Sequence, residues 1–171
     1  MIMSLCRSRP GGRSRGRLGH AEIIGELHRL RAHGELRSPR RHPAGPASPL
    51  HPPGGAKLRL NHWALAGDWT IQEEAARLDT ADGRIACRFQ ARDLNLVMEP
   101  AAPGTPTRFR VLLDGQPPGP DHGTDVDDHG SGTLAEQRLY QLVRQHGPVT
   151  ERTFHITFPD PGAEAYAFTF G

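Results

Sequence analysis

Short apolar runs separated by turn residues are the feature of this sequence that most restricts its fold. They follow one another through residues 58–171, and none keeps helical spacing for more than about three turns. Several runs alternate between apolar and polar residues, as in the run 84–91, where Ile85, Cys87 and Phe89 share one face. We therefore predict an all-β fold, an antiparallel, jelly-roll-like sandwich.

The spacing of these runs predicts about eight strands. Residues 80–83 form a hairpin turn between two of them, because the Asp-Gly pair supplies the positive φ angles that tight hairpins need. The run 137–144 alternates only imperfectly, so a strand is predicted there with a helix as the alternative. A long polar loop covers residues 116–132. The predicted strands are residues 69–71, 75–78, 84–91, 93–98, 108–113, 137–144, 153–158 and 163–170.

Residues 1–57 differ sharply from the rest of the chain. They carry ten arginines and one lysine against three glutamates, a net charge of +8, whereas residues 58–171 carry ten arginines against sixteen acidic residues, a net charge of −6. The first segment is rich in Pro, Gly and Ser, and its one apolar-periodic island, residues 21–31, predicts a short amphipathic helix. We expect a disordered basic arm over residues 1–57 and one folded domain over residues 58–171.

The basic arm has three interpretations. In the first, its arginines neutralise the phosphates of a nucleic acid or of an anionic membrane. The arm lacks interleaved aromatic residues for base stacking, however, so we do not expect nucleic-acid binding. In the second, it is a solvated tail, a linker or the product of a misassigned start. In the third, it is the translation of a GC-rich gene in a shifted frame.

Several functional classes are disfavoured by what the sequence lacks. No apolar run approaches the length of a membrane helix, and the amino terminus has no apolar export signal, which predicts a soluble, cytoplasmic monomer. Cys6 and Cys87 form neither a Cys-x-x-Cys pair nor a zinc pattern. The histidines show no metal-binding spacing, and there is no nucleophile elbow or phosphate loop. We therefore expect neither an enzyme nor a cofactor, with calcium as the one exception considered below.

Two tryptophans are the first candidates for ligand binding. An indole face offers a flat apolar surface to the C–H groups of a sugar, and Trp63 and Trp69 lie close together in the sequence. The polar neighbours Asn61 and Asp68 would hydrogen-bond sugar hydroxyls. Packing in the core is the alternative for both tryptophans.

A second set of candidate ligand-binding residues lies further along the chain. Tyr140 offers another aromatic surface, and Arg138 and Gln116 are its candidate polar partners on an exposed face. The alternative for this set is an ordinary sheet surface.

The acidic segment 125–136 resembles a calcium-binding loop. Asp125, Asp127 and Glu136 occupy the first, third and twelfth positions, with glycine at the sixth. His129 at the fifth position is a poor ligand for a hard cation, and no flanking helix pair is predicted. Calcium binding and a solvated acidic turn are therefore both retained as interpretations.

A series of short motifs carries a family resemblance across nearly all of residues 58–171. Together they resemble the domain at the carboxyl end of DipZ-type and related thioredoxin family proteins. The resemblance implies a β-sandwich similar to carbohydrate-binding modules, placed outside the cytoplasmic membrane behind a redoxin domain. The motifs are Leu60-Asn61-x-Trp63-x-Leu65-x-Gly67-x-Trp69, Arg84-Ile85, Phe89-x-Ala91-x-Asp93-Leu94-x-Leu96-Val97, Phe109-x-Val111-x-Leu113-Asp114-Gly115, Asp125-Val126-Asp127, Gly130-x-Gly132-Thr133, Arg138-Leu139-Tyr140-Gln141-Leu142 and Phe168-Thr169-Phe170-Gly171.

The chain departs from this family upstream of Leu58. The redoxin domain with its Cys-x-x-Cys motif is expected there, and the basic arm takes its place. The redox activity that the resemblance implies is therefore not carried over to this chain. The leading hypothesis is a non-catalytic accessory module that binds a glycan or a redoxin-domain partner. The alternatives are an inactive fragment of a thiol-disulfide oxidoreductase and a protein-protein interaction module without sugar binding.

Overall fold

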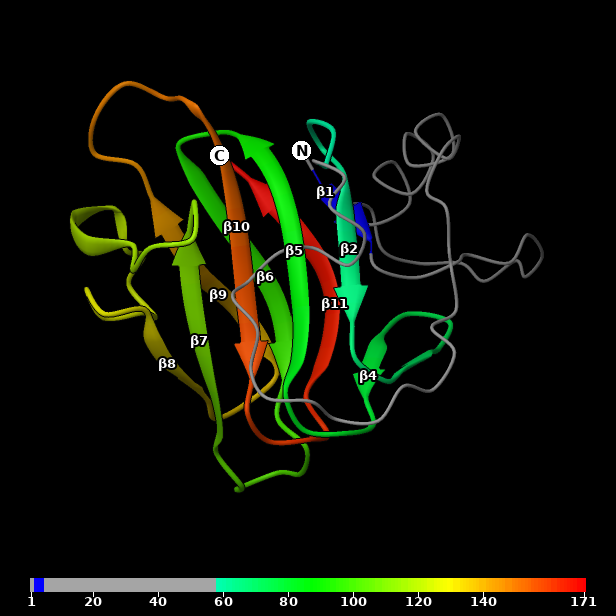
Figure 1. The fold of residues 1–171 in the computed structure, drawn as a ribbon. Helices are drawn as coiled ribbons and strands as arrows, with labels where there is room; N and C mark the ends of the chain where they lie inside the picture. The colour runs from blue at the N-terminus through cyan, green and yellow to red at the C-terminus, as the bar shows by residue number, and fades with distance from the viewer. Residues whose placement is uncertain (1, 5–57) are drawn as a thin grey trace, which may run out of the picture.

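The structure, a computed structural model, describes residues 2–4 and 58–171, and it is built from strands, turns and one short 3-10 helix. The strands form two antiparallel sheets that face each other (Figure 1). One sheet has the strand order β3-β4-β11-β6-β9, with β1 pairing with β11, and the other has the order β2-β5-β10-β7-β8. The strands are β1 (Ile2–Ser4), β2 (Trp63–Ala66), β3 (Trp69–Ile71), β4 (Ala76–Leu78), β5 (Gly83–Gln90), β6 (Asp93–Glu99), β7 (Thr107–Leu113), β8 (Ser131–Leu134), β9 (Arg138–Arg144), β10 (Glu151–Phe158) and β11 (Glu164–Phe170), and the helix η1 covers Gly119–Asp121.

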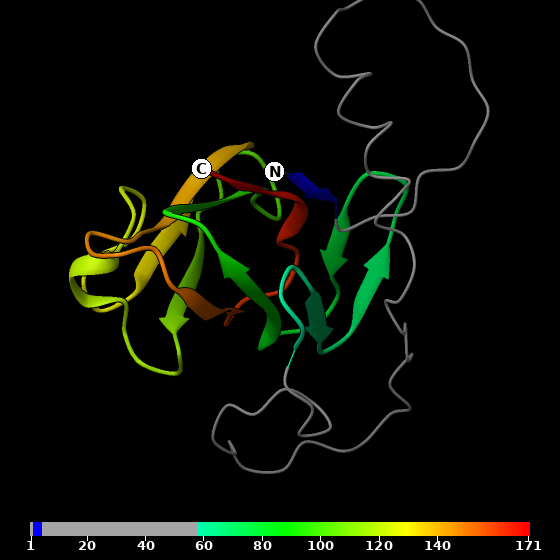
Figure 2. The ribbon, with the colours of Figure 1, turned by 90° about the horizontal axis from the view of Figure 1, so that it is seen from above.

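The chain crosses repeatedly from one sheet to the other. From β4 to β7 every consecutive strand changes sheet, and the same happens from β8 to β11. Seen from above, the sheets form two separate layers, with β1 in the layer of β11 (Figure 2). This alternation between sheets is the strand connectivity of a jelly-roll-like sandwich, and it confirms the predicted fold class.

The core lies between the two sheets, where alternate residues of each strand point inward. In β7, for example, Phe109, Val111 and Leu113 are buried while the residues between them face outward. Aromatic rings join the layers, since Phe154 of β10 meets Phe168 of β11 edge-on at a centroid distance of 6.0 Å. The outer faces of both sheets are consequently left to polar side chains, and any binding surface must be built there or at the ends of the sandwich.

All eight predicted strands are confirmed, and 137–144 is a strand rather than a helix. The structure adds two short strands within residues 58–171. They are β2 and β8, and each lies at an edge of its sheet. Their sequences, Trp-Ala-Leu-Ala and Ser-Gly-Thr-Leu, hold small residues that carry little strand propensity. Hydrogen bonding to a longer neighbouring strand therefore stabilises each of these short strands, although their own residues have little strand propensity.

Part of the predicted arm has regular structure. Residues 2–4 form β1, which pairs antiparallel with β11 at Ala167, Phe168 and Thr169. The sequence did not predict this strand, because three residues carry no periodicity of their own. The helix predicted over residues 21–31 lies outside the described residues. Within the part of the chain that the structure describes, no helix is long and apolar enough to cross a membrane.

Candidate functional site

The two tryptophans lie against the core. Trp63 of β2 points to the same side of the sheet as its partner Cys87 and packs on the core. The indole Nε1 of Trp69 donates a hydrogen bond to the carbonyl oxygen of Ala66 at 3.0 Å, and its ring meets Phe158 edge-on at a centroid distance of 6.1 Å. These contacts correspond to the packing alternative rather than to the predicted sugar-stacking role.

The predicted polar partners lie at exposed turns. Asn61 has a left-handed φ of 61°, and its backbone N–H donates to the carbonyl oxygen of Arg88 at 2.7 Å. Asp68 lies in the turn between β2 and β3. Gln116 follows β7, where its backbone N–H and carbonyl both hydrogen-bond to Leu113. Each of these residues therefore lies in or beside a turn.

Tyr140 is a core residue, so its predicted role on a ligand-binding surface is wrong. Its side chain is 0% exposed. The hydroxyl donates to the carbonyl oxygen of Glu136 at 2.7 Å and accepts from the backbone N–H groups of Ala135 and Glu136 at 3.1 and 3.3 Å. The guanidinium of Arg138 lies 3.8 Å from the centroid of the ring and covers it. The tyrosine anchors the β8–β9 turn instead of meeting a ligand.

The predicted calcium ligands are occupied by other partners. Asp125 accepts a charged hydrogen bond from Arg138 at 2.6 Å and another from the N–H of Gln141 at 2.7 Å. Partial burial acts to raise the pKa of Asp125, but these two donors outweigh it and the pKa is lowered. Asp127 accepts from the N–H of Ser131. Among the described residues, no group of three or more His, Cys, Asp or Glu side chains is placed to hold a metal ion, so the predicted ligands do not converge.

The structure does not bring the predicted ligand-binding residues together. Asn61, Trp63, Asp68 and Trp69 belong to β2, β3 and the turns beside them, at one edge of the sandwich. Arg138 and Tyr140 belong to β9 at the opposite edge. The full width of the sheets separates the two groups, so they cannot form one site.

A different surface has the features of a binding site: the outer face of the β2-β5-β10-β7-β8 sheet. Its central row runs across four paired strands through Ala64, Ala86, His155 and Leu112. The row on one side contains Arg84, Thr157 and Arg110, and the row on the other contains Arg88 and Thr153. The central row, which carries no charged acidic or arginine side chain, therefore lies between two rows that contain arginines. We call the outward residues Arg84, Arg88, Arg110, Thr153, His155 and Thr157 the arginine face.

His155 at the centre of the arginine face has unused hydrogen-bonding capacity. Both ring nitrogens are buried, and neither has a hydrogen-bond partner among the described residues. Burial lowers the pKa of His155, the nearby Arg84 lowers it further, and Asp114 acts in the opposite direction. The imidazole is therefore held neutral, and its nitrogens lie beneath the surface of the arginine face.

The arginines of this sheet fall into two groups. Arg88 forms an ion pair with Glu151 at 2.6 Å, and Arg108 forms one with Asp160 at 3.3 Å. Arg84 and Arg110 have no ion-pair partner among the residues that the structure describes. The N–H groups of these two guanidinium groups are therefore available to donate hydrogen bonds to another molecule.

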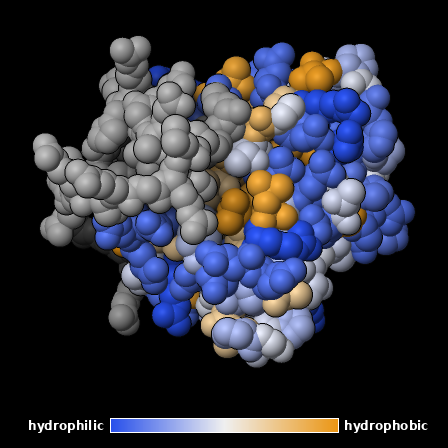
Figure 3. Space-filling view, turned by 180° about the vertical axis from the view of Figure 1, so that it is seen from behind, coloured by the Kyte–Doolittle hydropathy of each residue, from blue (hydrophilic) through white to orange (hydrophobic). Residues whose placement is uncertain are grey.

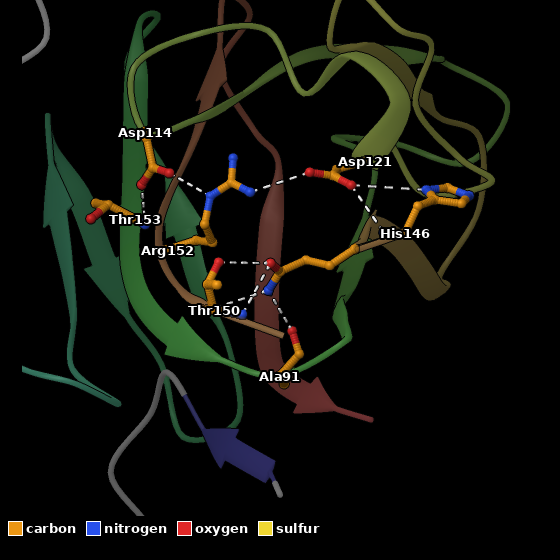
Figure 4. A network of polar contacts seen from close by, with 8 residues as sticks. Ala91, Asp114, Asp121, His146, Thr150, Arg152 and Thr153 are labelled. Carbon is orange, nitrogen blue, oxygen red and sulfur yellow. Dashed lines mark hydrogen bonds and ion pairs between the residues drawn. The ribbon is translucent and has the colours of Figure 1, made fainter. Parts of the chain in front are cut away.

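A network of polar contacts holds the loops at one end of the arginine face (Figure 4). Arg152 of β10 forms ion pairs with Asp114, in the turn after β7, and with Asp121 of η1 at 3.2 Å. The carboxylate of Asp121 also accepts from the N–H of His146 at 3.0 Å. Asp114 in turn accepts from the N–H of Thr153 at 2.7 Å. The network ties three loops to β10 and fixes the strand that carries His155 and Thr157.

Cys87 is unsuited to thiol chemistry, because burial raises its pKa to about 12. We expect its thiol to react with a disulfide reagent about a thousand-fold more slowly in the folded protein than in denaturant. Measurement in a Cys6→Ser variant isolates the Cys87 signal. Rapid reaction of the folded variant would contradict the buried position.

The arginine face also predicts a pH dependence of stability. The pKa of His155 is lower in the folded state than in the unfolded chain, so the unfolded chain binds the proton first as the pH falls. The free energy of unfolding should therefore decrease as the pH drops below about 6.5, and level off below the folded-state pKa. Denaturant unfolding at several pH values should show a smaller decrease for His155→Gln than for the wild type. Equal decreases would show that His155 is not held neutral by its surroundings.

Arg84, Arg110 and His155 were not predicted as site residues. The sequence does show their alternation with buried neighbours within the strands β5, β7 and β10. It does not show that β10 inserts between β5 and β7 and thereby places all three on one surface. The sequence does place arginines at the polar positions of the predicted strands 84–91 and 108–113, and this pattern could have indicated a cationic surface.

Comparison with known proteins agrees with this architecture. Residues 44–171 match the family described as thioredoxin like C-terminal domain, and the match begins inside the predicted arm. A family two carbohydrate esterase from Clostridium thermocellum, solved with cellohexaose, superposes with a TM-score of 0.50 at 10% identity over 64% of this chain. The chain spans 31% of that esterase's length.

A further solved structure, a family two carbohydrate esterase from Cellvibrio japonicus, gives a TM-score of 0.49 at 12% identity over 64% of this chain and 30% of its own. No curated protein matches the sequence. The family match covers well over half of the residues, and the motifs that carry the resemblance are spread across the sandwich. The chain therefore belongs to the family of thioredoxin-like C-terminal domains.

Proposed function

We propose that the sandwich is a non-catalytic accessory module that binds carbohydrate on the arginine face. The observation that carries the proposal is the pair formed by Arg84 and Arg110, which lie in one row of the face and have no ion-pair partner among the residues that the structure describes. A sugar presents hydroxyl oxygens that accept hydrogen bonds from guanidinium groups. The neighbouring Thr153 and Thr157 add two more hydroxyls on the same face.

The flatness of a sheet suits an extended ligand. Five strands present one continuous outer surface, and the short side chains of Ala64 and Ala86 occupy one half of the central row. The esterase that shares this fold was solved with cellohexaose, a linear oligosaccharide, which makes that sugar a suitable first probe. The likeness to the esterase concerns the fold, so the choice of face rests on the residues of this chain alone.

A blocking substitution tests the proposed face. Ala64→Trp places a large side chain in the central row from the edge strand β2, where a backbone shift costs little. Thr70→Trp is the matched control, because Thr70 is an exposed residue on the edge strand β3 of the other sheet. Binding to a panel of oligosaccharides, measured by calorimetry, should weaken at least about tenfold in Ala64→Trp and remain unchanged in Thr70→Trp. Weaker binding by Thr70→Trp, or unchanged binding by Ala64→Trp, would contradict the assignment of the arginine face as the sugar-binding surface.

A second candidate function, contact with a partner protein, is favoured by the outer face of the other sheet. Leu139 is 46% exposed and lies in one cross-strand row with Val97 and Ala167. Viewed from behind, the molecule shows a small group of apolar residues surrounded by polar ones (Figure 3). A redoxin domain is the partner that the family name suggests. Leu139→Asp should abolish such a contact while leaving sugar binding on the arginine face intact.

A further inference from the structure

Residues 58–171 contain more acidic residues than arginines, so an arginine without an ion pair is unexpected there. Residues 58–171 contain ten arginines and sixteen acidic residues, so acidic partners are plentiful. Five arginines use them in ion pairs, and five have no ion pair within the described part of the chain. Three of the latter, Arg59, Arg77 and Arg92, lie singly at turns or on the other sheet. The remaining two, Arg84 and Arg110, lie in the same row of the arginine face.

The strand register places these two arginines around one hydroxyl. Thr157 of β10 pairs directly with Arg84 of β5 on one side and with Arg110 of β7 on the other. Neighbouring strands lie about 4.8 Å apart, so the two Cα atoms are about 10 Å from each other. Two guanidinium groups on long side chains can converge over that distance on an anion above Thr157.

His155 extends the same site. It lies two residues from Thr157 on β10, on the same outer face, and its ring nitrogens lack partners among the described residues. Two uncompensated cations beside an unpartnered imidazole are electrostatically unfavourable in the free protein. A bound anion would relieve the repulsion between the two cations, because it neutralises the arginines.

We infer that the arginine face recognises an acidic glycan, whose carboxylate is held by Arg84 and Arg110 above Thr157. This inference rests on the proposed function and narrows its ligand to sugars that carry a carboxylate. A polyphosphate chain such as a nucleic acid fits less well. The outward residues of the five strands include no Phe, Tyr or Trp on which bases could stack.

The test compares two charge-removing variants with a matched control in the full chain. Arg84→Gln and Arg110→Gln each remove one cation of the site, and Arg77→Gln removes an exposed cation from β4 in the other sheet. Calorimetric titration with an oligogalacturonate, with cellohexaose and with a single-stranded oligonucleotide covers the three ligand classes. The basic arm of residues 1–57 is present in all variants, so any binding to it is common to them and cancels in the comparison.

We expect the oligogalacturonate to bind the wild type more tightly than cellohexaose, with an affinity that falls as salt is added. Arg84→Gln and Arg110→Gln should each lower that affinity about tenfold, and Arg77→Gln should leave it unchanged. Equal binding of both sugars that the two variants weaken would overturn this inference while the proposed function stood. Equal binding that neither variant weakens would overturn both. Absence of binding to either sugar would overturn both. Tighter oligonucleotide binding that Arg84→Gln weakens would assign the face to nucleic acid instead.

Discussion

Replacing Phe158 with alanine is expected to lower the free energy of unfolding by about 3–5 kcal/mol, the range typical of a large aromatic residue lost from a core. Phe158 is 0% exposed and ends β10 between the two sheets. Its ring meets Trp69 at a centroid distance of 6.1 Å and Phe109 at 6.4 Å. The substitution would leave a cavity at the point where β3, β7 and β10 meet, and rigid neighbouring rings cannot close it.

Denaturant unfolding followed by tryptophan fluorescence measures this effect. Val149→Ala is the control, because Val149 is 44% exposed and its truncation should change stability by less than about 0.5 kcal/mol. Phe158→Leu keeps most of the volume and should show an intermediate loss, so the comparison remains informative if Phe158→Ala does not fold. A loss below about 1 kcal/mol for Phe158→Ala would contradict the packing described for this residue.

Replacing Gln145 with alanine is expected to lower the free energy of unfolding by about 1–3 kcal/mol, because the substitution removes the hydrogen bonds of a buried amide that joins two loops. Gln145 is 3% exposed. Its Nε2 donates to the carbonyl oxygens of Ala91 and Thr150 at 2.9 and 3.0 Å, and its Oε1 accepts from the hydroxyl of Thr150 at 3.2 Å. The side chain thereby joins the β9–β10 loop to the β5–β6 turn.

The same unfolding experiment with Gln90→Ala supplies the control, since Gln90 is exposed at the end of β5. Hydrogen exchange gives a second readout, because loss of the amide should increase exchange in the residue 145–150 loop more than in β6. If Gln145→Ala were as stable as Gln90→Ala, the loop would not depend on this amide. The ion pairs of Arg152 with Asp114 and Asp121, drawn in Figure 4 together with the bonds of this amide, would then be the main restraint on the loop.

The strands were predictable because their alternation follows from the geometry of a sheet with one buried face. Ile85, Cys87 and Phe89 are all 0% exposed, as their spacing predicted. The alternation fails in β9, and the structure shows why. The pairing of β6 with β9 shifts register between Leu94 and Asn95, so the neighbours Leu142 and Val143 are both buried. A bulge of this kind depends on the partner strand and leaves no local sequence signal.

The site was less predictable than the fold, for a similar reason. Trp63, Trp69 and Tyr140 were natural candidates, since exposed aromatic residues bind sugars, yet their chemistry serves packing equally well. Only tertiary contacts distinguish the two roles, such as the hydrogen bonds of the Tyr140 hydroxyl to the β8–β9 turn. Arg84 and Arg110 become neighbours only through β10, which follows β7 by a long stretch of chain. The arginine face therefore depends on pairing between strands that are distant in the sequence. Patterns within a single strand do not reveal such pairing.

The most direct test of the carbohydrate-binding role is an amide chemical-shift map recorded while oligogalacturonate and cellohexaose are titrated into the protein. The account predicts that the perturbed amides cluster in β5, β7 and β10, around Arg84, Arg110 and His155. Perturbations that cluster instead in β6, β9 and β11, or that are missing with both sugars, would contradict the assignment of the arginine face as the binding surface.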